Sequence, residues 1–206
     1  MALPSRLYLI VDPLDTGRDP LALAQAMLAG GARLLQLRLK DEIDTRRLLA
    51  HAAAIREATA AVGATFIVND RADIAAAVGA DGVHLGQDDL PIDAARHVLG
   101  PQALIGLSTH DEDQLAAAAN TSADYLSLGP IFPTTSKANP DPVVGTERLA
   151  KARALVHHPL VAIGGITAAT AAATLATGAD TIAVISDIVR APDVGRATAQ
   201  LLDSIA

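Results

Sequence analysis

Polar side chains with ligand chemistry follow short apolar runs of the chain, at the points where buried strands would end. Asn69 and Asp70 come after the run 65–68, and Asp89 lies four residues beyond the run 82–85. Carboxylate oxygens without His or Cys partners suit Mg²⁺, which proteins bind through one or two carboxylates together with waters and substrate phosphates. If the two runs are neighbouring strands, Asp70 and Asp89 reach a common point and predict a Mg²⁺ site.

Side chains that could donate hydrogen bonds to a polyanion occupy comparable positions. Arg38, Lys40 and Lys137 carry positive charge, and Ser108 adds a hydroxyl. Guanidinium and ammonium groups are the usual donors to phosphate oxygens. The four residues therefore predict a site for a phosphorylated, metal-bound group, although Arg38 and Lys40 taken alone could be solvated loop charges.

Two further stretches predict a second anion site. Gly164-Gly165 and Ile185-Ser186 end the last two apolar runs. In a barrel of eight strand–helix units, the loops after strands 7 and 8 commonly bind phosphate through backbone N–H groups. Two phosphate sites and one metal imply two phosphorylated substrates, or one substrate with two such ends.

Several of these residues also have a purely structural interpretation. Asp70 and Asp89 could each cap the helix that follows, and Gly164-Gly165 could serve only as a tight turn. His84 lies inside an apolar run and is expected to be a core histidine with satisfied hydrogen bonds, while His110 could cap a helix. These interpretations do not explain why polar donors collect at the ends of so many runs, so we favour the functional one.

Eight apolar runs must position these groups. They cover residues 7–11, 34–37, 65–68, 82–85, 103–106, 125–128, 160–163 and 181–185. They are apolar throughout rather than alternating, which is typical of parallel strands covered on both faces. Helical segments are predicted between them, at 20–29, 45–62, 74–78, 111–119, 146–154, 167–177 and 191–205, because most are rich in Ala and Leu and have helix-boundary residues at their ends.

This alternation predicts an α/β fold, specifically a (β/α)8 TIM barrel. We expect one domain over residues 1–206, since eight units use nearly the whole length. The triplets at 79–81, 122–124 and 178–180 read Gly-Ala-Asp, Ser-Ala-Asp and Gly-Ala-Asp, and each closes a helix and opens a strand.

The composition excludes several function classes. The chain has no Cys and no Trp, only two Tyr and two Phe, and a formal net charge of -7. These values exclude disulfides, thiolate catalysis and Cys-ligated zinc, and argue against nucleic-acid binding. No apolar run approaches the 18 residues of a membrane span, and the first residues do not resemble a secretion signal. We therefore expect a cytoplasmic protein without membrane contact.

The motifs resemble those of the thiamine phosphate synthase family over nearly the whole chain. The matching stretches are 8–12, 36–40, 69–71, 81–89, 106–110, 129–137, 162–166 and 183–186. The stretch 129–137, Gly-Pro-Ile-Phe-Pro-Thr-Thr-Ser-Lys, is the most specific of them. The resemblance implies a transferase that condenses a hydroxymethylpyrimidine diphosphate with a thiazole phosphate to give thiamine phosphate and pyrophosphate.

The resemblance also implies roles for individual residues. The pyrimidine diphosphate would be held by Gln36, Arg38, Lys40, Asn69, Ser108 and Lys137, of which Arg38, Lys40, Ser108 and Lys137 would be catalytic. The thiazole phosphate would be held by Thr134, Thr135, Ser136, Gly165, Ile185 and Ser186. Asp70 and Asp89 would bind the Mg²⁺ cofactor. The expected partners are small phosphorylated molecules; a homo-oligomer is compatible with the sequence, which does not define the oligomeric state.

Two positions depart from the family pattern, and two other functions remain open. Leu39 stands where the family often has Glu, and by strand alternation it should point away from the site. Ser136 replaces the usual Thr and keeps the hydroxyl. The alternatives are a thiazole tautomerase on the same fold, for which His110 is the candidate proton-transfer residue, and a non-catalytic protein that binds thiazole phosphate or thiamine phosphate.

Overall fold

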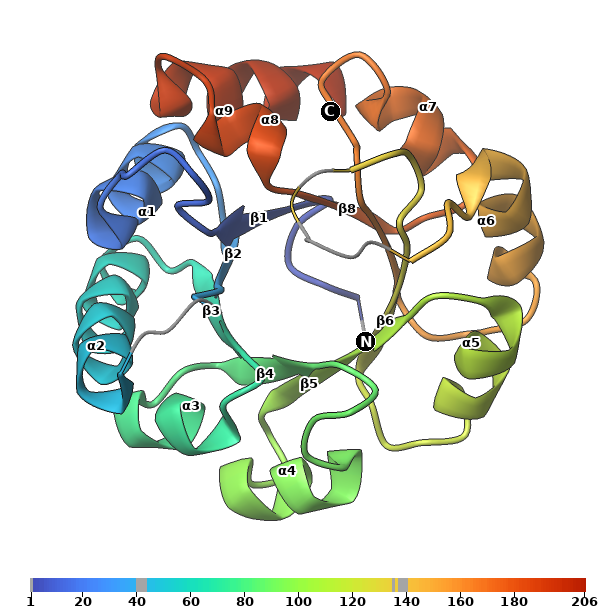
Figure 1. Ribbon diagram of the computed structural model, residues 1–206, viewed down its shortest axis with the longest axis horizontal. Helices are drawn as coiled ribbons and strands as arrows, with labels where there is room; N and C mark the ends of the chain where they lie inside the picture. The colour runs from blue at the N-terminus through green and yellow to red at the C-terminus, as the bar shows by residue number, and fades with distance from the viewer. Residues whose placement is uncertain (1, 40–43, 135, 137–140) are drawn as a thin grey trace.

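Eight parallel strands close into a barrel that is surrounded by helices (Figure 1). The computed structural model describes residues 2–39, 44–134, 136 and 141–206. Each strand pairs with the next one along the chain, and β8 pairs with β1 to close the ring. The strands are β1 (Leu7–Val11), β2 (Leu34–Leu37), β3 (Thr65–Asn69), β4 (Gly82–Leu85), β5 (Leu104–Thr109), β6 (Tyr125–Leu128), β7 (Leu160–Ile163) and β8 (Thr181–Val184).

The predicted (β/α)8 TIM barrel is confirmed, with small differences in the helices. The helices are α1 (Pro20–Ala29), α2 (Thr45–Ala61), α3 (Ala72–Val78), α4 (Ile92–Leu99), α5 (Glu112–Ala118), α6 (Gly145–Arg153), α7 (Ala171–Ala176), α8 (Ser186–Val189) and α9 (Val194–Ser204). The predicted helical segments do not include α4, which is short and whose N-cap residue, Pro91, makes no side-chain cap hydrogen bond. The predicted segment 191–205 contains α9, but the short helix α8, which directly follows β8, is not among the predicted segments.

Four of the helices begin in the same way. The side chains of Asp19, Asp44, Asp111 and Asp193 each accept a hydrogen bond from the backbone N–H three residues further on, at 2.8–2.9 Å. A carboxylate in this position satisfies one of the N–H groups that a helix leaves unpaired. These four residues therefore fix where α1, α2, α5 and α9 begin.

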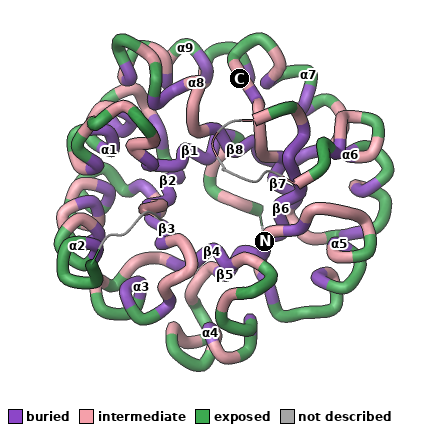
Figure 2. Tube along the Cα trace, in the orientation of Figure 1, coloured by how far each residue is buried: buried purple, intermediate pink, exposed green. Residues whose placement is uncertain are grey.

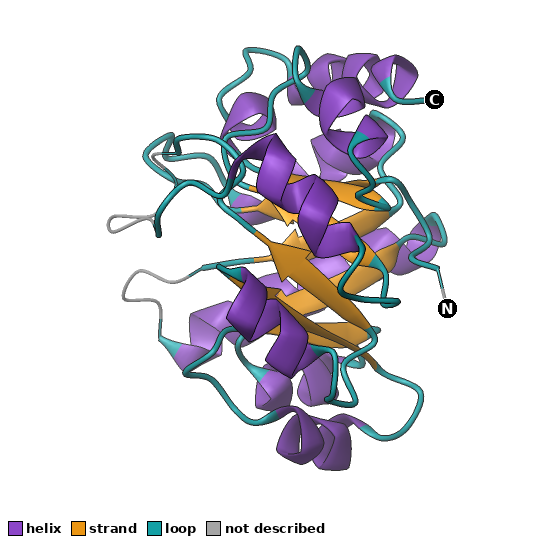
Figure 3. Ribbon diagram, turned by 90° about the vertical axis from the view of Figure 1, so that its right-hand side faces the viewer, coloured by secondary structure: helices purple, strands orange, loops and turns teal. Residues whose placement is uncertain are grey.

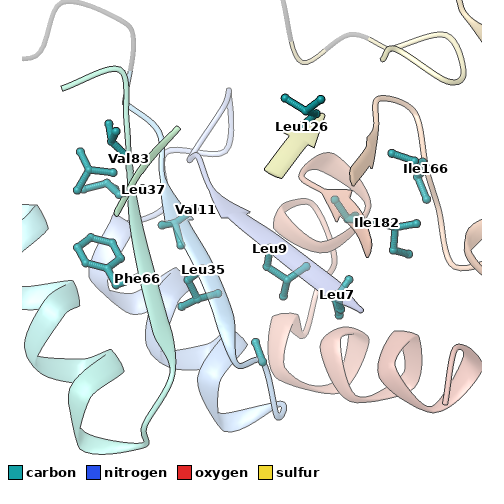
Figure 4. Close-up of a cluster of buried hydrophobic side chains, with 14 of the residues drawn as sticks. Leu7, Leu9, Val11, Leu35, Leu37, Phe66, Val83, Leu126, Ile166 and Ile182 are labelled. Atoms are coloured by element: carbon teal, nitrogen blue, oxygen red, sulfur yellow. The ribbon is translucent and has the colours of Figure 1, made fainter. Parts of the chain in front are cut away.

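Strand alternation divides the apolar residues into two layers. Leu7, Leu9 and Val11 of β1 belong to the large cluster between the barrel and the helices, which Figure 4 shows together with residues of β2 and β3. Tyr8 and Ile10 point into the barrel and belong to a smaller interior cluster. Because successive side chains of a strand face opposite ways, this alternation decides which polar residues at the strand ends face the centre.

An Arg–Asp pair recurs at the amino ends of the strands. The pairs are Arg56–Asp81, Arg96–Asp124 and Arg153–Asp180, at 3.0, 2.6 and 2.7 Å. In each pair the same Asp oxygen also accepts the first backbone N–H of the preceding strand or of the residue next to its start, at 2.8 Å. The three Asp residues are the last members of the triplets noted in the sequence, so these triplets bind neighbouring strand–helix units together.

The figures show where the chain termini and the buried residues lie. Both chain termini lie on the side of the amino ends of the strands (Figure 3), where Arg6 Nη1 donates to the carbonyl of Ile205 at 2.8 Å. Figure 2 shows buried strands at the centre and helices with exposed outer faces. No helix in the described part of the chain is long and apolar enough to cross a membrane.

Candidate active site

Polar side chains from several strands face the interior at the carboxyl end of the barrel. Asp12 follows β1, Arg38 follows β2, Asn69 ends β3 and Ser108 lies near the end of β5. All four lie in register with the interior positions of their strands, because Ile10, Leu34 and Ile67 belong to the interior cluster and Leu104 of β5 packs against it. This end of a barrel is where catalytic groups gather in enzymes of the fold.

Arg38 is oriented by an ion pair with Asp12. Arg38 Nη1 donates to Asp12 Oδ2, and the Asp12 carboxylate is buried, with 7% of the residue exposed. The other Asp12 oxygen accepts the backbone N–H of Leu14 at 2.9 Å. An Arg–carboxylate pair restricts the guanidinium to one orientation, so Asp12 positions the predicted catalytic arginine. Leu39 packs on the outer apolar layer, as alternation predicts.

Asp70 and Asp89 do not cap the helices that follow them, so the capping interpretation is wrong. The N-cap residue of α3 is Arg71 and that of α4 is Pro91, and neither helix has a side-chain cap. Asp70 instead adopts a left-handed backbone with φ of 61°, a conformation that costs a non-glycine residue about 1–2 kcal/mol. Strain of this kind is concentrated at functional positions.

The same two carboxylates belong to adjacent loops. The Asp70 backbone N–H donates to the carbonyl of His84 on β4 at 2.8 Å, which holds the end of β3 against β4. Asp89 Oδ2 accepts the backbone N–H of Gly86, just after β4, at 2.6 Å. Among the described residues no group of three or more His, Cys, Asp or Glu could hold a metal. Two oxygen-donor side chains from neighbouring strands fit Mg²⁺, whose remaining ligands come from water and phosphate.

A chain of hydrogen bonds crosses the barrel interior beneath this rim. Gln36 Nε2 donates to Tyr8 Oη at 2.7 Å, and Tyr8 Oη lies 3.1 Å from Tyr125 Oη. Tyr125 Oη lies 3.0 Å from His84 Nδ1, and His84 Nε2 lies 2.8 Å from Ser108 Oγ. Burial raises the pKa of Tyr8 and of Tyr125, so both phenols keep their protons. His84 is a histidine with both nitrogens hydrogen-bonded, as expected, but one partner is the predicted catalytic Ser108.

Gly106 makes room for this chain of hydrogen bonds. The rings of His84 and Tyr125 stack with centroids 5.4 Å apart. A Cβ atom on Gly106 would lie 2.1 Å from Tyr125 Cζ and 2.5 Å from His84 Nδ1. Real Cβ contacts are never so short, so only glycine fits at this position of β5.

The two glycines of the second predicted anion site lie where the loop after β7 meets the loop after β6. Gly164 and Gly165 have φ of 97° and 65°, and the Phe132 N–H donates to the Gly164 carbonyl at 2.9 Å. A Cβ on Gly164 would lie 2.6 Å from Pro130 Cα, and one on Gly165 would lie 2.4 Å from the Pro133 carbonyl oxygen. Both glycines are thus required by the backbone conformation and by close packing of the two loops.

The remaining thiazole-phosphate candidates border the same region. Thr134 Oγ1 accepts the backbone N–H of Ser136 at 3.2 Å, and α8 begins at Ser186 directly after Ile185. Asp187 Oδ2 accepts the N–H of Ala168 at 2.9 Å, which joins the loops after β7 and β8. Three predicted site residues, Lys40, Thr135 and Lys137, lie outside the described residues.

Sequence reasoning missed part of this arrangement. Asp12, Tyr8 and Tyr125 were not predicted as site residues, although the even-numbered alternation of β1 places Tyr8 and Asp12 on the same inward face. His110 does not cap α5, whose cap is Asp111; its Nδ1 lies 2.9 Å from the Gly129 carbonyl and 3.5 Å from Asp141 Oδ2.

A separate hollow lies at the opposite end of the barrel. Its volume is about 440 Å³, and Arg153 and Asp180 are among its lining residues. Arg153 is already bound to Asp180 and to two backbone carbonyls there. That rim serves to hold strand–helix units together, so this hollow is not the site.

Comparison with known proteins decides the family. The family described as "Thiamine monophosphate synthase" matches residues 7–188. The chain belongs to the thiamine monophosphate synthase family. The thiamine-phosphate synthase of Methanoculleus marisnigri is 49% identical over 97% of this chain and 95% of its own. That of Koribacter versatilis is 47% identical over 91% and 90%.

A solved structure of the family has the same fold. Thiamine phosphate pyrophosphorylase from Pyrococcus furiosus superimposes with a TM-score of 0.88 at 38% identity, covering 97% of this chain and 95% of its own. The family that the sequence motifs predicted is therefore confirmed. The chain is an enzyme of thiamine biosynthesis, as the name of the family states.

Proposed function

We propose that the chain condenses a hydroxymethylpyrimidine diphosphate with a thiazole phosphate to give thiamine phosphate and pyrophosphate. The proposal is carried by the family match over residues 7–188 and by the polar residues at the carboxyl end of the barrel. Arg38, Asp70 and Ser108 come from one half of that rim, and Gly165 and Ser186 from the other. A site with two anion-binding halves suits a reaction between two phosphorylated molecules.

The diphosphate half promotes bond cleavage. Mg²⁺ bound by Asp70 and Asp89 would neutralise part of the charge on the diphosphate. Arg38, held by Asp12, donates to the leaving oxygens, and Ser108 adds a further hydrogen bond. Lys40 and Lys137 are proposed for the same half, with Gln36 and Asn69 placing the pyrimidine. The bond between the methylene carbon and the diphosphate oxygen breaks, and its electron pair leaves with pyrophosphate.

The thiazole half supplies the nucleophile in the correct orientation. Backbone N–H groups at Gly165 and at the Ile185-Ser186 junction bind the thiazole phosphate, together with Thr134, Thr135 and Ser136. The thiazole nitrogen uses its lone pair to form the new C–N bond to the methylene carbon. No protein nucleophile is needed, so the absence of Cys from the sequence does not affect this mechanism. Positioning and exclusion of water supply the remaining acceleration.

The direct test is a product assay with the purified chain, both substrates and Mg²⁺. We expect thiamine phosphate and pyrophosphate in equal amounts, and loss of both when a chelator is added. No product from a folded chain would contradict the proposed function. Product that persists unchanged in chelator would contradict the metal assignment alone.

A matched pair of variants tests Asp89. Asp89→Asn keeps an oxygen that can accept the Gly86 N–H and removes only the charge, so we expect at least a roughly 100-fold loss of kcat. Asp88→Asn removes the same charge from the exposed neighbouring residue and should change kcat little. Equal effects of the two substitutions would mean that Asp89 acts only through the net charge of the loop.

Two further expectations belong to this proposal. Two phosphorylated substrates are charged and do not cross membranes readily, which supports a cytoplasmic location. A homo-oligomer stays a prediction that sedimentation of the purified chain would check.

A further inference from the structure

The hydrogen-bond chain in the barrel has a direction, which follows from counting protons. The amide nitrogen of Gln36 can only donate, so Tyr8 Oη accepts from it at 2.7 Å. Tyr8 is 1% exposed, and Tyr125 Oη is the acceptor for its proton among the described residues. If Tyr125 donated to Tyr8 instead, the Tyr8 proton would be buried without an acceptor, which is unfavourable. Tyr8 therefore donates to Tyr125.

The same proton count gives the direction of the hydrogen bonds at His84. Tyr125 has one proton and accepts from Tyr8, so it donates to His84 Nδ1 at 3.0 Å. A neutral imidazole whose Nδ1 accepts carries its proton on Nε2. His84 Nε2 therefore donates to Ser108 Oγ at 2.8 Å. Ser108 accepts this bond and keeps its own proton for another acceptor.

The neighbours of Ser108 leave its hydroxyl proton for an acceptor at the carboxyl end of the barrel. Ser127 Oγ is the other hydroxyl near Ser108, at 3.5 Å, and it is a donor in that contact. Ser127 Oγ also lies 3.4 Å from His84 Nε2, so both hydroxyls gather around the same ring nitrogen. Ser108 is half-buried at the carboxyl end of β5, where the proposed function places the diphosphate.

We propose that His84 is a positioning residue, fixed by Tyr125 in the Nε2–H tautomer, and that it thereby makes Ser108 a hydrogen-bond donor to the pyrimidine diphosphate. The substrate part of this inference rests on the proposed function, whereas the tautomer of His84 does not. Gly106 supports the inference, because its missing side chain is what allows Tyr125 to reach His84. The chain of hydrogen bonds also links Gln36 on β2 with Ser108 on β5 without interruption.

The tautomer can be read directly by nuclear magnetic resonance on the substrate-free protein. Protein labelled with ¹⁵N at histidine gives distinct nitrogen shifts and coupling patterns for the two neutral tautomers, and the His84 signals are assigned as those missing from His84→Gln. We expect Nε2–H at neutral pH in the wild type. An Nδ1–H tautomer or a doubly protonated ring would overturn the proposal.

Two Tyr→Phe substitutions provide a matched test of direction. Tyr125→Phe removes the donor to Nδ1, so His84 should become a mixture of tautomers. Tyr8→Phe makes the same chemical change one step earlier and leaves Tyr125 with His84 as its acceptor, so the Nε2–H tautomer should persist. An unchanged tautomer in Tyr125→Phe, or equal mixing in both variants, would overturn the proposal.

Kinetics then test the consequence for catalysis. His84→Ala should lower kcat/KM for the pyrimidine diphosphate about 10- to 100-fold, the usual effect of losing a residue that orients a site group. His84→Gln offers an amide N–H to Ser108 and should recover most of that loss, and the KM for the thiazole phosphate should change little. Absence of rescue in a folded Gln variant, or equal loss toward both substrates, would overturn the positioning role. A wild type without synthase activity but with the predicted tautomer would refute only the proposed function.

Discussion

Substitution of Gly106 by Ala tests whether the interior of the barrel is as closely packed around this residue as the distances indicate. The added Cβ would lie 2.1 Å from Tyr125 Cζ, 2.4 Å from Tyr125 Cε2 and 2.5 Å from His84 Nδ1. Tyr125 is completely buried and hydrogen-bonded at its hydroxyl, so its ring cannot move aside without breaking contacts. The backbone of Gly106 is not among the positive-φ glycines, so the cost arises from packing alone.

The magnitude follows from two destabilising effects and one stabilising effect. Overpacking of a core costs about 1–3 kcal/mol, and loss of the Tyr125–His84 hydrogen bond adds about 1 kcal/mol. Replacing glycine by alanine restricts the unfolded chain and returns about 0.4–1 kcal/mol. The free energy of unfolding should therefore fall by roughly 2–3 kcal/mol, equivalent to a lowering of Tm by about 4–12 °C for a chain of this length.

The assay combines thermal unfolding with the product assay. Gly106→Ala should lose both stability and activity, because the displaced Tyr125 no longer directs His84 toward Ser108. Gly63→Ala is the control, since Gly63 has φ of 65° but a Cβ there meets nothing within 4 Å. That control should lose about 1–2 kcal/mol from backbone strain and keep its activity. A Gly106→Ala protein as stable and active as the wild type would refute this account of the interior.

Three other substitutions test separate parts of the structure. Asp12→Asn should raise the KM for the pyrimidine diphosphate about 10-fold or more in steady-state kinetics, because Arg38 loses the charge that orients it; an unchanged KM would show that Arg38 is positioned otherwise. Asp124→Ala should lower the free energy of unfolding in urea by about 1.5–3 kcal/mol, since it removes a charge-assisted bond and a strand N–H acceptor together. Arg148 lowers the pKa of Glu112 to about 2. The stability from that pair is present above about pH 4.5 and is lost as the pH falls toward 2. The free energy of unfolding of Glu112→Gln in urea should therefore depend less on pH over that window than that of the wild type. An identical pH dependence would contradict the assignment.

Much of the fold could be predicted because the signals are local. The run 160–163 and its counterparts are short and apolar throughout, which is typical of parallel strands covered on both faces. Aspartates such as Asp19 and Asp111 mark helix starts by bonding a backbone group three residues away. α4, which is not among the predicted segments, has no such cap: its N-cap residue is Pro91 and the helix begins at Ile92.

The candidate site could be predicted in part, for a related reason. Gly164 and Gly165 stand out in the sequence because backbone conformation and close approach both require glycine there. Asp70 and Asp89 resemble helix caps equally well in sequence, because capping and metal binding use the same side chain. Only the observed cap residues of α3 and α4 exclude the capping interpretation.

The sequence by itself determined the alternation of strand and helix, the family motifs and the inward face of each strand, because all of these depend on residues close together in the chain. The tertiary structure alone decided that Tyr8 and Tyr125, 117 positions apart, share a hydrogen bond, and that Asp12 holds Arg38. The first contact joins β1 with β6 across the interior of the closed barrel, and the second requires the pairing of β1 with β2. Closure brings interior side chains of distant strands into one small, dry volume, where every polar group must find a partner.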